Sequence, residues 1–301
     1  MRKRKEELYG YEFDESTDTL TKEKDGQRLK VRKLSEAHEL APYVGLLNGI
    51  WGFPDKEALP LHEYVVSVKT GGLFLAVELD GEAAGLVQVA PAWTREWGFH
   101  HHSNFMGFLP GLRAKGLGLE AKRAHVIFAR RDGVGLVTWT FDPAQALNAN
   151  LNFRKLGATC GTYLPDLYGS MGGEFDAGLA SDRLLVEWRI DSDLVRERLS
   201  GKAPTDEEVS CEFRDDPAVI VERFGMYITG NPREGITGKM LVAIPSEVHD
   251  LAKENKRAAE GMLIEFRELM RTLFGKGYKV VGSVRAGVRD GHAWYALTKG
   301  A

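Results

Sequence analysis

Residues 106–121 join a basic, glycine-bearing turn to the start of a helical pattern. The turn reads Arg113-Ala-Lys-Gly116-Leu-Gly118 and follows an apolar stretch. The first turn of a helix leaves backbone N–H groups without intrahelical partners, and the helix dipole adds positive potential there. Glycine lets the backbone approach an anion without a Cβ in between. Together with the charges of Arg113 and Lys115, this turn predicts a binding site for a pyrophosphate.

The same glycines also fit a dinucleotide fingerprint. Gly116-Leu-Gly118-Leu-Glu-Ala121 matches G-x-G-x-x-G/A, and Asp142 follows about 20 residues later, where a ribose ligand is expected. A dinucleotide fold places this fingerprint after its first strand. Here at least three strands are predicted before the turn, two of them in an antiparallel hairpin, so the dinucleotide interpretation is disfavoured. A third interpretation is that the glycines serve only a connection between strand and helix.

The context of the turn resembles the GNAT superfamily of N-acyltransferases. Arg113-x-x-Gly116-x-Gly118 is similar to the family's acyl-CoA pyrophosphate loop, Q/R-x-x-G-x-G/A, which lies between its fourth strand and third helix. Asn148-Ala-Asn-Leu-Asn-Phe-Arg-Lys-Leu-Gly157 resembles the end of the family's fourth helix. The likeness covers residues 28–190. The runs that begin at Trp139 and Ser181 resemble a subgroup of predicted acetyltransferases with a C-terminal extension.

This resemblance implies an α/β fold with a mixed, mostly antiparallel central sheet flanked by helices and a smaller C-terminal α/β extension. We expect a polar N-terminal arm over residues 1–27, an acyl-CoA-binding domain over 28–190 and a β-α-β-β extension over 191–301. Apolar periodicity and turn residues predict the individual elements. Strands are expected at 28–34, 73–79, 84–90, 101–109, 136–141, 182–190, 239–244, 278–285 and 292–297, and helices at 36–51 with Ser35 as cap, 61–69, 117–131, 145–156 and 246–274.

The resemblance also implies the chemistry, which is direct transfer of an acyl group from a CoA thioester to an amine. Acetyl-CoA or another acyl-CoA is then the co-substrate, and a small-molecule amine or amino acid is the acceptor. The family supplies a backbone N–H for the thioester oxygen, and that position maps to Phe108. The expected cofactor contacts are Phe108, Leu109, Arg113, Ala114, Lys115, Gly116, Leu117, Gly118, Leu119, Asn148, Asn152 and Phe153.

Three consecutive histidines, His100, His101 and His102, precede the turn on a predicted strand. Alternate residues of a strand face opposite sides, so Met106 and Phe108 are expected to share a face with His102. Family members that use a base on this strand carry it at the position of His102. A histidine with an ordinary pKa near 6.5 is available as a neutral base at pH 7. The non-functional alternative is that the polar start of a strand simply exposes three histidines.

The general acid is where the chain departs from the family pattern. The family's tyrosine on the fourth helix maps to Phe153, which cannot donate a proton. Tyr163 or Tyr168 could substitute, although each also suits packing. A thiolate is a good leaving group, and general acid help contributes roughly 10²–10⁴-fold, so chemistry without it is slower but feasible. Phe153 therefore keeps a second interpretation open, a non-catalytic acyl-CoA-binding module, while a nicotinamide-dependent oxidoreductase is a weaker third.

The acceptor side of the predicted site is less specific. The family builds this side from its first helices and the loop between its last two strands. Aromatic candidates are Trp51, Phe53, Trp93 and Trp97, beside the glycine-rich segment 169–178. Arginines that could bind a carboxylate are Arg95, Arg154 and Arg183, although exposed surface arginines are the commoner case.

Bulk composition narrows the class of protein. The 301 residues are 43% hydrophobic and 28% charged, with a formal net charge of -3, which disfavours a nucleic-acid binder. Neither a membrane span nor a secretory signal is expected, since apolar runs are short and no apolar region follows the basic N-terminus. Cys160 and Cys211 lack metal-ligand spacing, so no metal is expected, and a reducing cytoplasm is the simplest location. A homodimer is left open.

Overall fold

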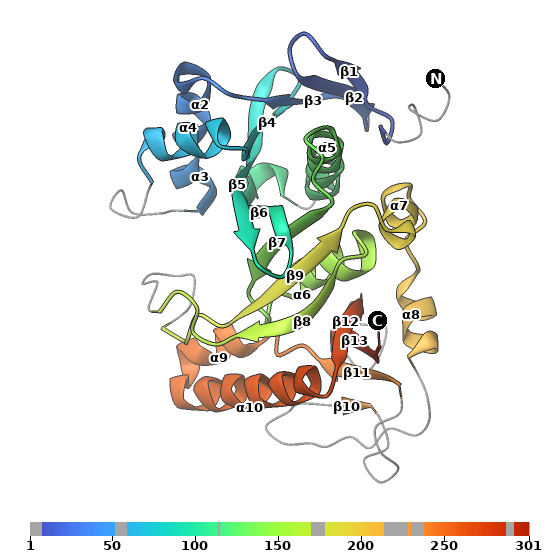
Figure 1. Cartoon of the computed structure of the whole chain (residues 1–301). Coiled ribbons are helices and arrows are strands. Elements are labelled where there is room, and N and C mark those ends of the chain that lie inside the picture. Colours follow the sequence, from blue (N-terminus) through green and yellow to red (C-terminus); the bar gives the residue numbers. More distant parts are fainter. Residues whose placement is uncertain are drawn as a thin grey trace. The chain divides into compact units, whose positions relative to one another are not determined.

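The computed structural model describes residues 8–51, 59–113, 115–169, 178–213, 228–229, 238–286 and 292–300 (Figure 1). The chain divides into two compact units. The first unit is Met1–Trp139 with Arg189–Asp191, and the second is Thr140–Trp188 with Ser192–Ala301. The division falls inside the range 28–190, so the domain boundaries proposed from the sequence stay a prediction.

The first unit is built on a sheet in the strand order β1-β2-β3-β4-β5-β6-β7. Neighbouring strands are antiparallel except for β6 and β7, which are parallel. The predicted mixed, mostly antiparallel α/β class is therefore confirmed. The strands are β1 (Glu12–Asp14), β2 (Thr19–Lys24), β3 (Gln27–Lys33), β4 (Leu73–Leu79), β5 (Glu82–Thr94), β6 (Gly98–Phe108) and β7 (Leu136–Phe141).

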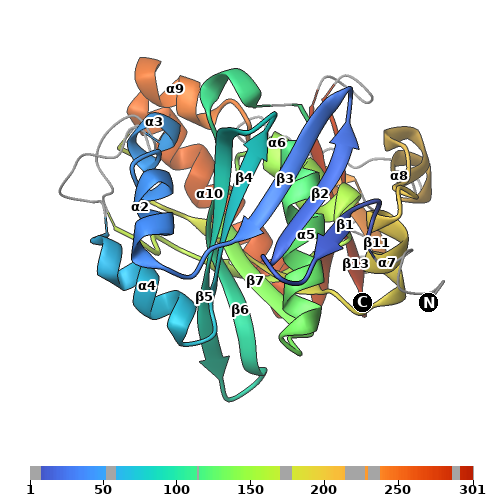
Figure 2. The ribbon, with the colours of Figure 1, turned by 90° about the horizontal axis from the view of Figure 1, so that it is seen from above.

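Helices cover both faces of this sheet. Figure 2 shows α2 (Ala37–Val44), α3 (Leu47–Trp51) and α4 (Leu61–Lys69) on one side of β4, β5 and β6, and α5 (Leu117–Arg131) on the other. Strand β4 is buried on both faces, because Leu75 and Val77 pack in the core under α5 while Phe74 and Ala76 pack in the core under α2 and α4. A short 3-10 turn, Pro110–Leu112, separates β6 from the loop before α5.

Over residues 8–27, the described part of the polar arm expected at 1–27, the chain is packed rather than loose. Strand β2 pairs antiparallel with β3 along its whole length, and Leu20 and Tyr11 are buried in the core under α5. The charged residues that suggested a tail alternate with these apolar ones, as in any half-buried strand. Strands β1 and β2 of this segment are therefore part of the sheet.

The predicted helix 36–51 is also corrected, because it forms two helices with a break at Gly45 and Leu46. The cap is Glu36 rather than Ser35. The backbone N–H of Glu36 donates to the Glu39 carboxylate at 3.2 Å, which is half of a capping box.

The second unit holds a sheet in the order β9-β8-β12-β13-β11-β10. Its strands are β8 (Thr159–Leu164), β9 (Arg183–Arg189), β10 (Ile228–Thr229), β11 (Lys239–Ala243), β12 (Tyr278–Val284) and β13 (Trp294–Lys299). Its helices are α6 (Ala146–Ala149), the π-helical η3 (Asn150–Lys155), α7 (Asp193–Leu199), α8 (Asp206–Glu212), α9 (Val248–Glu254) and α10 (Lys256–Gly275). The single predicted helix 246–274 is thus two helices. They separate at Asn255, whose side chain caps α10 by accepting from the Ala258 N–H at 3.1 Å.

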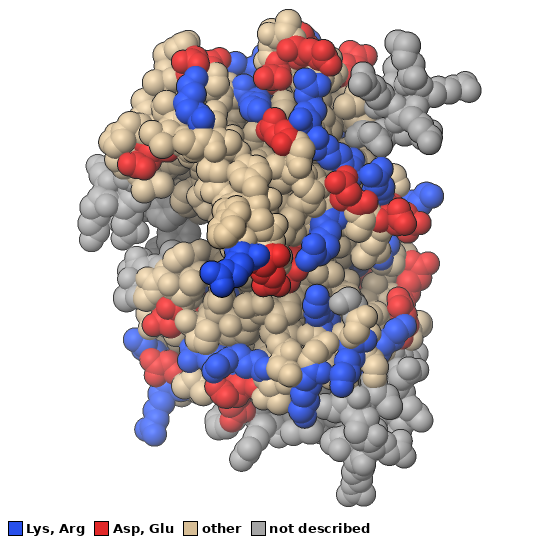
Figure 3. Space-filling view, in the orientation of Figure 1, with Lys and Arg blue, Asp and Glu red and all other residues tan. Residues whose placement is uncertain are grey.

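Two buried carboxylates tie the second unit together. Asp182 accepts both guanidinium N–H groups of Arg267 at 2.8 and 2.9 Å and the Tyr163 hydroxyl at 2.7 Å. Asp206 accepts from Arg285 at 2.7 Å. Such fully partnered ion pairs keep a buried charge tolerable. No helix among the described residues is long and apolar enough to cross a membrane. On the face in Figure 3, basic and acidic side chains are interspersed.

Candidate active site

Strands β6 and β7 pair only at their beginnings. The parallel register joins His101 to Val137 and His102 to Thr138, and β6 continues to Phe108 with no strand paired to that side among the described residues. Two parallel strands that meet at one end and part at the other leave an open edge on each. This edge of β6 lies within the first unit and ends at the predicted pyrophosphate loop.

Two backbone amides of β6 point into this open edge. The Leu109 N–H donates to the Ala84 carbonyl at 3.0 Å, so Leu109 faces Ala84 as a hydrogen-bonded pair. In an antiparallel pair the next residue points its N–H and C=O the other way, which here is true of Phe108 and, two residues earlier, of Met106. The Phe108 carbonyl does point outward, because Arg113 Nε donates to it at 3.4 Å. The sequence predicted a role for the Phe108 amide and none for that of Met106, and the role itself stays a prediction.

A β-bulge corrects the expected faces of β6. Gln88 pairs with Phe105 while Val89 pairs with Ser103, so Asn104 has no counterpart on β5. A bulge reverses the alternation beyond it. Met106 and Phe108 consequently pack in the core under α5, as Ser103 does, and His102 lies on the opposite face. The prediction that His102 shares a face with Met106 and Phe108 is wrong.

His102 sits where β6 and β7 part. Its Nδ1 lies 2.8 Å from the Thr138 hydroxyl of β7, and the side chain is half-buried. Burial lowers the pKa of His102 to about 4, with smaller contributions from the nearby charges of His100 and Lys122. His102 is therefore a neutral imidazole across the physiological range and a weaker base than an ordinary histidine.

The loop after β6 has the backbone features expected of an anion site. Gly116 has φ of 75° and stands as the N-cap of α5, in the left-handed region that glycine favours. The Glu120 N–H donates to the Gly116 carbonyl at 3.4 Å. Among the described residues, no acceptor is recorded for the N–H groups of Leu117 and Leu119. These first-turn amides and the dipole of a 15-residue helix therefore remain for a ligand.

The two charged side chains of the loop differ in their contacts. Arg113 directs its guanidinium at the carbonyls of Phe108 and Ile50, so it braces the end of β6 against α3. Lys115 is exposed. Leu109 is half-buried beside α3, where it joins the core under α2 and α4. Ala114 lies outside the described residues.

Strand β2 brings further charges to this loop that sequence reasoning missed. Lys24 Cε and Nζ lie 3.7 Å from the position of a Cβ built on Gly116. Lys22, on the same strand, pairs at 2.8 Å with Glu120 in the first turn of α5. The only sequence signal was the pair of lysines at alternate positions, and the segment was assigned to a tail.

The remaining predicted cofactor residues belong to the second unit. Asn148 is exposed on α6, whereas Asn152 is buried on η3. Phe153 is 1% exposed, with its ring centroid 5.8 Å from those of Phe141 and Tyr295. The position of the family's tyrosine is thus occupied by a packed core side chain.

Tyr163 and Tyr168, the two tyrosines suggested as general acids, differ in burial and in hydrogen bonding. The Tyr163 hydroxyl donates to Asp182 at 2.7 Å, and burial, with the Asp182 charge, raises its pKa far above the usual range. Tyr168 is 52% exposed, and its hydroxyl lies 2.8 Å from that of Thr140. Of the two, Tyr168 has the accessible hydroxyl.

The aromatic acceptor candidates do not form one cluster. Trp51 packs on the backbone of β6, since a Cβ on Gly107 would come within 2.4 Å of its ring. Trp93 is 70% exposed and belongs to the far end of the β5–β6 hairpin, where it pairs with Phe99. Trp97 lies in the turn of the same hairpin against His100. Phe53 and most of segment 169–178 lie outside the described residues.

Two of the three arginines suggested as carboxylate ligands already donate hydrogen bonds to groups within the protein. Arg154 is buried and donates to Asn150 at 2.6 Å and to the Pro204 carbonyl at 2.9 Å. Arg183 donates to the Asp182 carbonyl at 2.7 Å and lies over the Tyr168 ring. Arg95 is exposed in the β5–β6 turn. Arg154 is therefore removed from the acceptor side.

Two observations count against the dinucleotide interpretation. The glycine loop follows β6, after an antiparallel run of strands, rather than a first parallel strand. Asp142, the expected ribose ligand, accepts from His249 Nε2 at 2.6 Å and from the Ala144 N–H at 2.8 Å. Its carboxylate is thus already paired within the second unit.

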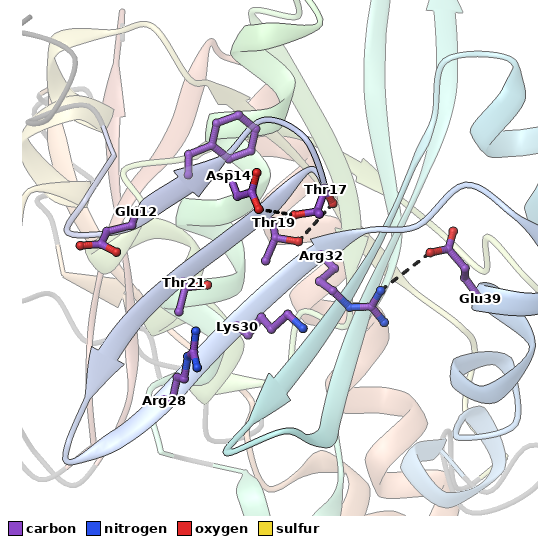
Figure 4. Close-up of a pocket in the computed structure, with 10 residues that line it drawn as sticks. Glu12, Asp14, Thr17, Thr19, Thr21, Arg28, Lys30, Arg32 and Glu39 are labelled. Carbon is purple, nitrogen blue, oxygen red and sulfur yellow. Dashed lines mark hydrogen bonds and ion pairs between the residues drawn. The ribbon is translucent and has the colours of Figure 1, made fainter.

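A separate polar hollow of about 730 Å³ lies on the outer face of β1, β2 and β3 (Figure 4). Arg28, Lys30 and Arg32 form a row along β3, beside threonines of β2. Glu78 neutralises two of these cations, at 3.3 Å from Lys30 and 2.9 Å from Arg32. The hollow is therefore a balanced charge network rather than an anion site.

Comparison of the sequence with protein-family models and with curated proteins found no match. Comparison with solved structures found acetyltransferases, some of them described as members of the GNAT family. YncA of Salmonella typhimurium, solved with acetyl-CoA, is 16% identical, with 55% of this chain and 95% of that chain covered and a TM-score of 0.42. A GNAT acetyltransferase from Streptococcus pneumoniae is 16% identical (53% and 97% covered, TM-score 0.42). The ribosomal-protein-alanine N-acetyltransferase of Brucella melitensis is 22% identical (52% and 97% covered, TM-score 0.40).

Proposed function

We propose that this protein is an acyl-CoA-dependent N-acyltransferase that acts on a small amine or amino acid. The observation that carries the proposal is the open edge of β6, with the amides of Met106 and Phe108 directed into it and the Gly116 loop at its end. An edge of unpaired peptide groups suits the amide-containing arm of coenzyme A, and a helix N-terminus with a glycine cap suits its pyrophosphate. The domain range 28–190 and a cytoplasmic location belong to the same proposal.

The backbone of this site fits such a co-substrate. The amides of Leu117 and Leu119 and the ammonium of Lys115 would hold the phosphates, and Phe108 would hold the arm. Acyl-CoA supplies the acyl group as an activated thioester. The Phe108 or Met106 N–H donates to the carbonyl oxygen as negative charge develops on it, which is the commonest large contribution to acyl transfer.

His102 is the proposed proton acceptor. The amine must lose a proton as its nitrogen bonds to the acyl carbon and the carbon–sulfur bond breaks to release the thiolate. His102 is neutral at pH 7 and can take that proton, directly or through water, and pass it on easily because its pKa is lowered to about 4. Departure of the thiolate needs little acid help, because a thiolate is a good leaving group.

Ligand-induced stabilisation and thiol release test the proposal together. We expect acetyl-CoA and CoA, but not NADH, to raise the unfolding temperature, because ligand at 100 times its Kd adds about 2.7 kcal/mol. Gly118→Glu places a carboxylate in the first turn of α5 and should abolish this shift. The matched control is Gly261→Glu on α10, where a Cβ meets open space. Stabilisation by NADH alone, or an unchanged shift in Gly118→Glu, would refute the proposed site.

A second candidate function is a non-catalytic acyl-CoA-binding module. The burial of Phe153 and the engagement of Tyr163 by Asp182 favour it, since neither supplies a free acid. An acceptor screen with acetyl-CoA and succinyl-CoA, read by free thiol, separates the two. Saturable binding without thiol release across amines and amino acids would support the module, and release with one acceptor class would support the enzyme.

A further inference from the structure

The β2–β3 hairpin carries its turn to the N-terminus of α5. The turn residues Asp25 and Gly26 have φ of 53° and 78°, as in a two-residue hairpin turn. Lys24 precedes this turn, and its Cε and Nζ lie 3.7 Å from the Cβ position at Gly116. The Lys24 side chain is 19% exposed, so it is packed over the loop rather than extended into solvent.

The charges around this helix end are arranged in favour of an anion. Glu120 in the first turn of α5 would repel a phosphate, but its carboxylate is paired with Lys22 at 2.8 Å and with Arg123 at 2.8 Å. Lys24 is not needed for that neutralisation. The partner recorded for it among the described residues is its neighbour Asp25, whose side chain is 80% exposed.

The ion pair of Lys24 with Asp25 is therefore easily exchanged. An exposed ion pair contributes about 0–1 kcal/mol, so a phosphate can displace the Asp25 carboxylate at little cost. Arg113, which the sequence suggested for this role, directs its guanidinium at two carbonyls. An anion held by the amides of Leu117 and Leu119 lies beside Gly116 and thus within reach of Lys24.

We infer that Lys24 is a phosphate ligand of the acyl-CoA site, contributed by the N-terminal hairpin. The inference rests on the proposed function and names a further residue of that site. The shared chemistry is a phosphate group, which in coenzyme A is either the pyrophosphate or the 3′-phosphate. Asp25 then acts as an internal competitor that occupies the ammonium when the ligand is absent.

Calorimetric titration of the full chain with CoA tests the inference. Lys24→Met should raise the Kd about tenfold, which is the lower end for a hydrogen bond to a charged group, and Lys24→Arg should keep the Kd within about threefold of the wild type. Asp25→Asn should lower the Kd two- to threefold, because the competing carboxylate is removed. The control is Lys33→Met, which removes a similar cation from the ion pair with Asp132 at the other end of α5.

A second titration with 3′-dephospho-CoA identifies the phosphate. An equal loss for both ligands in Lys24→Met assigns Lys24 to the pyrophosphate, and a loss confined to CoA assigns it to the 3′-phosphate. If wild type binds CoA while Lys24→Met and Asp25→Asn bind it equally well, the inference is refuted and the proposed function stands. If wild type binds neither ligand, both are refuted.

Discussion

The surroundings of His102 change the pKa that a histidine would ordinarily have. A histidine before the loop suggests a base with a pKa near neutrality. Burial beside Thr138 instead lowers its pKa to about 4, so its protonation does not change between pH 6 and 9. The pH dependence of the reaction should then follow the amine, whose pKa lies near 10 as in lysine.

We therefore predict a rate of thiol release that rises with pH from 6 to 9 without an inflection near 6.5. His102→Ala should lower the rate by a similar factor at every pH from 6 to 9, because His102 is neutral throughout this range and the fraction of free amine is the same for both proteins. General base help contributes roughly 10²–10⁴-fold. The CoA affinity should not change, because His102 is proposed to accept a proton from the amine and not to bind the phosphates.

The matched control for this measurement is His62→Ala, an exposed histidine on α4. A rate and pH profile in His102→Ala that coincide with those of the wild type would remove His102 from the base role. An inflection near 6.5 in the wild type that persists in His102→Ala would assign the titration to another group.

At the scale of elements, two glycines permit close packing around β6, Gly107 against α3 and Gly85 of β5 against β6 itself. A Cβ on Gly107 would lie 2.4 Å from the Trp51 ring and 2.5 Å from Ile50 Cγ2, and a Cβ on Gly85 would lie 2.3 Å from the Gly107 carbonyl oxygen. Glycine here serves close packing, not an unusual backbone angle. Arg113 also donates to the Ile50 carbonyl, so α3 contacts both β6 and the loop that follows it.

Gly107→Ala should accordingly destabilise the protein by about 1–3 kcal/mol, as overpacking does, and weaken CoA binding because the open edge of β6 is displaced. Chemical denaturation measures the first effect and titration the second. In a Trp51→Leu background the indole is removed as an obstacle while Ile50 remains, so the penalty should shrink without disappearing. An equal penalty in both backgrounds would show that Trp51 is not the obstacle. Gly261→Ala, where a Cβ meets nothing, is the control.

The elements also show what the sequence could predict. The antiparallel hairpin predicted from strands 73–79 and 84–90 is confirmed as β4 and β5, and its turn residues Asp80 and Gly81 both have positive φ, 52° and 90°. The helical pattern at 117–131, closed by Asp132-Gly133, matches α5, and the strand predicted at 136–141 matches β7. These signals are local, and each element's neighbours reinforce them.

What sequence reasoning missed depends on contacts between distant residues. No residue type marks Asn104 as bulged, because the bulge arises from the register of β5 against β6. Lys24 meets Gly116 only because β2 joins the sheet, and the alternation of Leu20 with polar residues gave too weak a signal in so charged a segment. The role of Arg113 was also hidden, because its guanidinium donates to the Ile50 carbonyl only where α3 lies beside the loop.

For the whole molecule, the buried bases of α5 shape how stability depends on pH. Lys122 is 2% exposed, donates to the Ser103 hydroxyl at 3.2 Å and lies 3.9 Å from the Trp139 ring centroid. Behind it, His125 Nε2 lies 3.4 Å from His101 Nδ1, with both rings fully buried. Burial lowers the pKa of Lys122 to about 7, and it lowers the pKa values of His101 and His125 as well.

The sign of the effect follows from where the protons bind. Unfolded Lys122 holds a proton below its ordinary pKa of 10.5, whereas folded Lys122 does so only below about 7. The unfolded state therefore gains protons first as pH falls through this window, and stability is lost there at up to about tenfold in the unfolding equilibrium constant per pH unit. Below pH 7 both states are protonated and this contribution becomes constant. His101 and His125 continue the loss below pH 6.5, because their folded pKa values are also lowered.

Lys122→Met keeps the length of the side chain and removes the buried charge. We predict that it raises the free energy of unfolding by a few kcal/mol at pH 7 and by little at pH 10, when denaturation is followed at both values. Loss of the bond to Ser103 offsets part of the gain, by about 1 kcal/mol at either pH. A gain that is the same at pH 7 and pH 10 would mean that the pKa of Lys122 is not lowered in the folded state. A loss at pH 7 would mean that its contacts with Ser103 and Trp139 outweigh the desolvation of the ammonium.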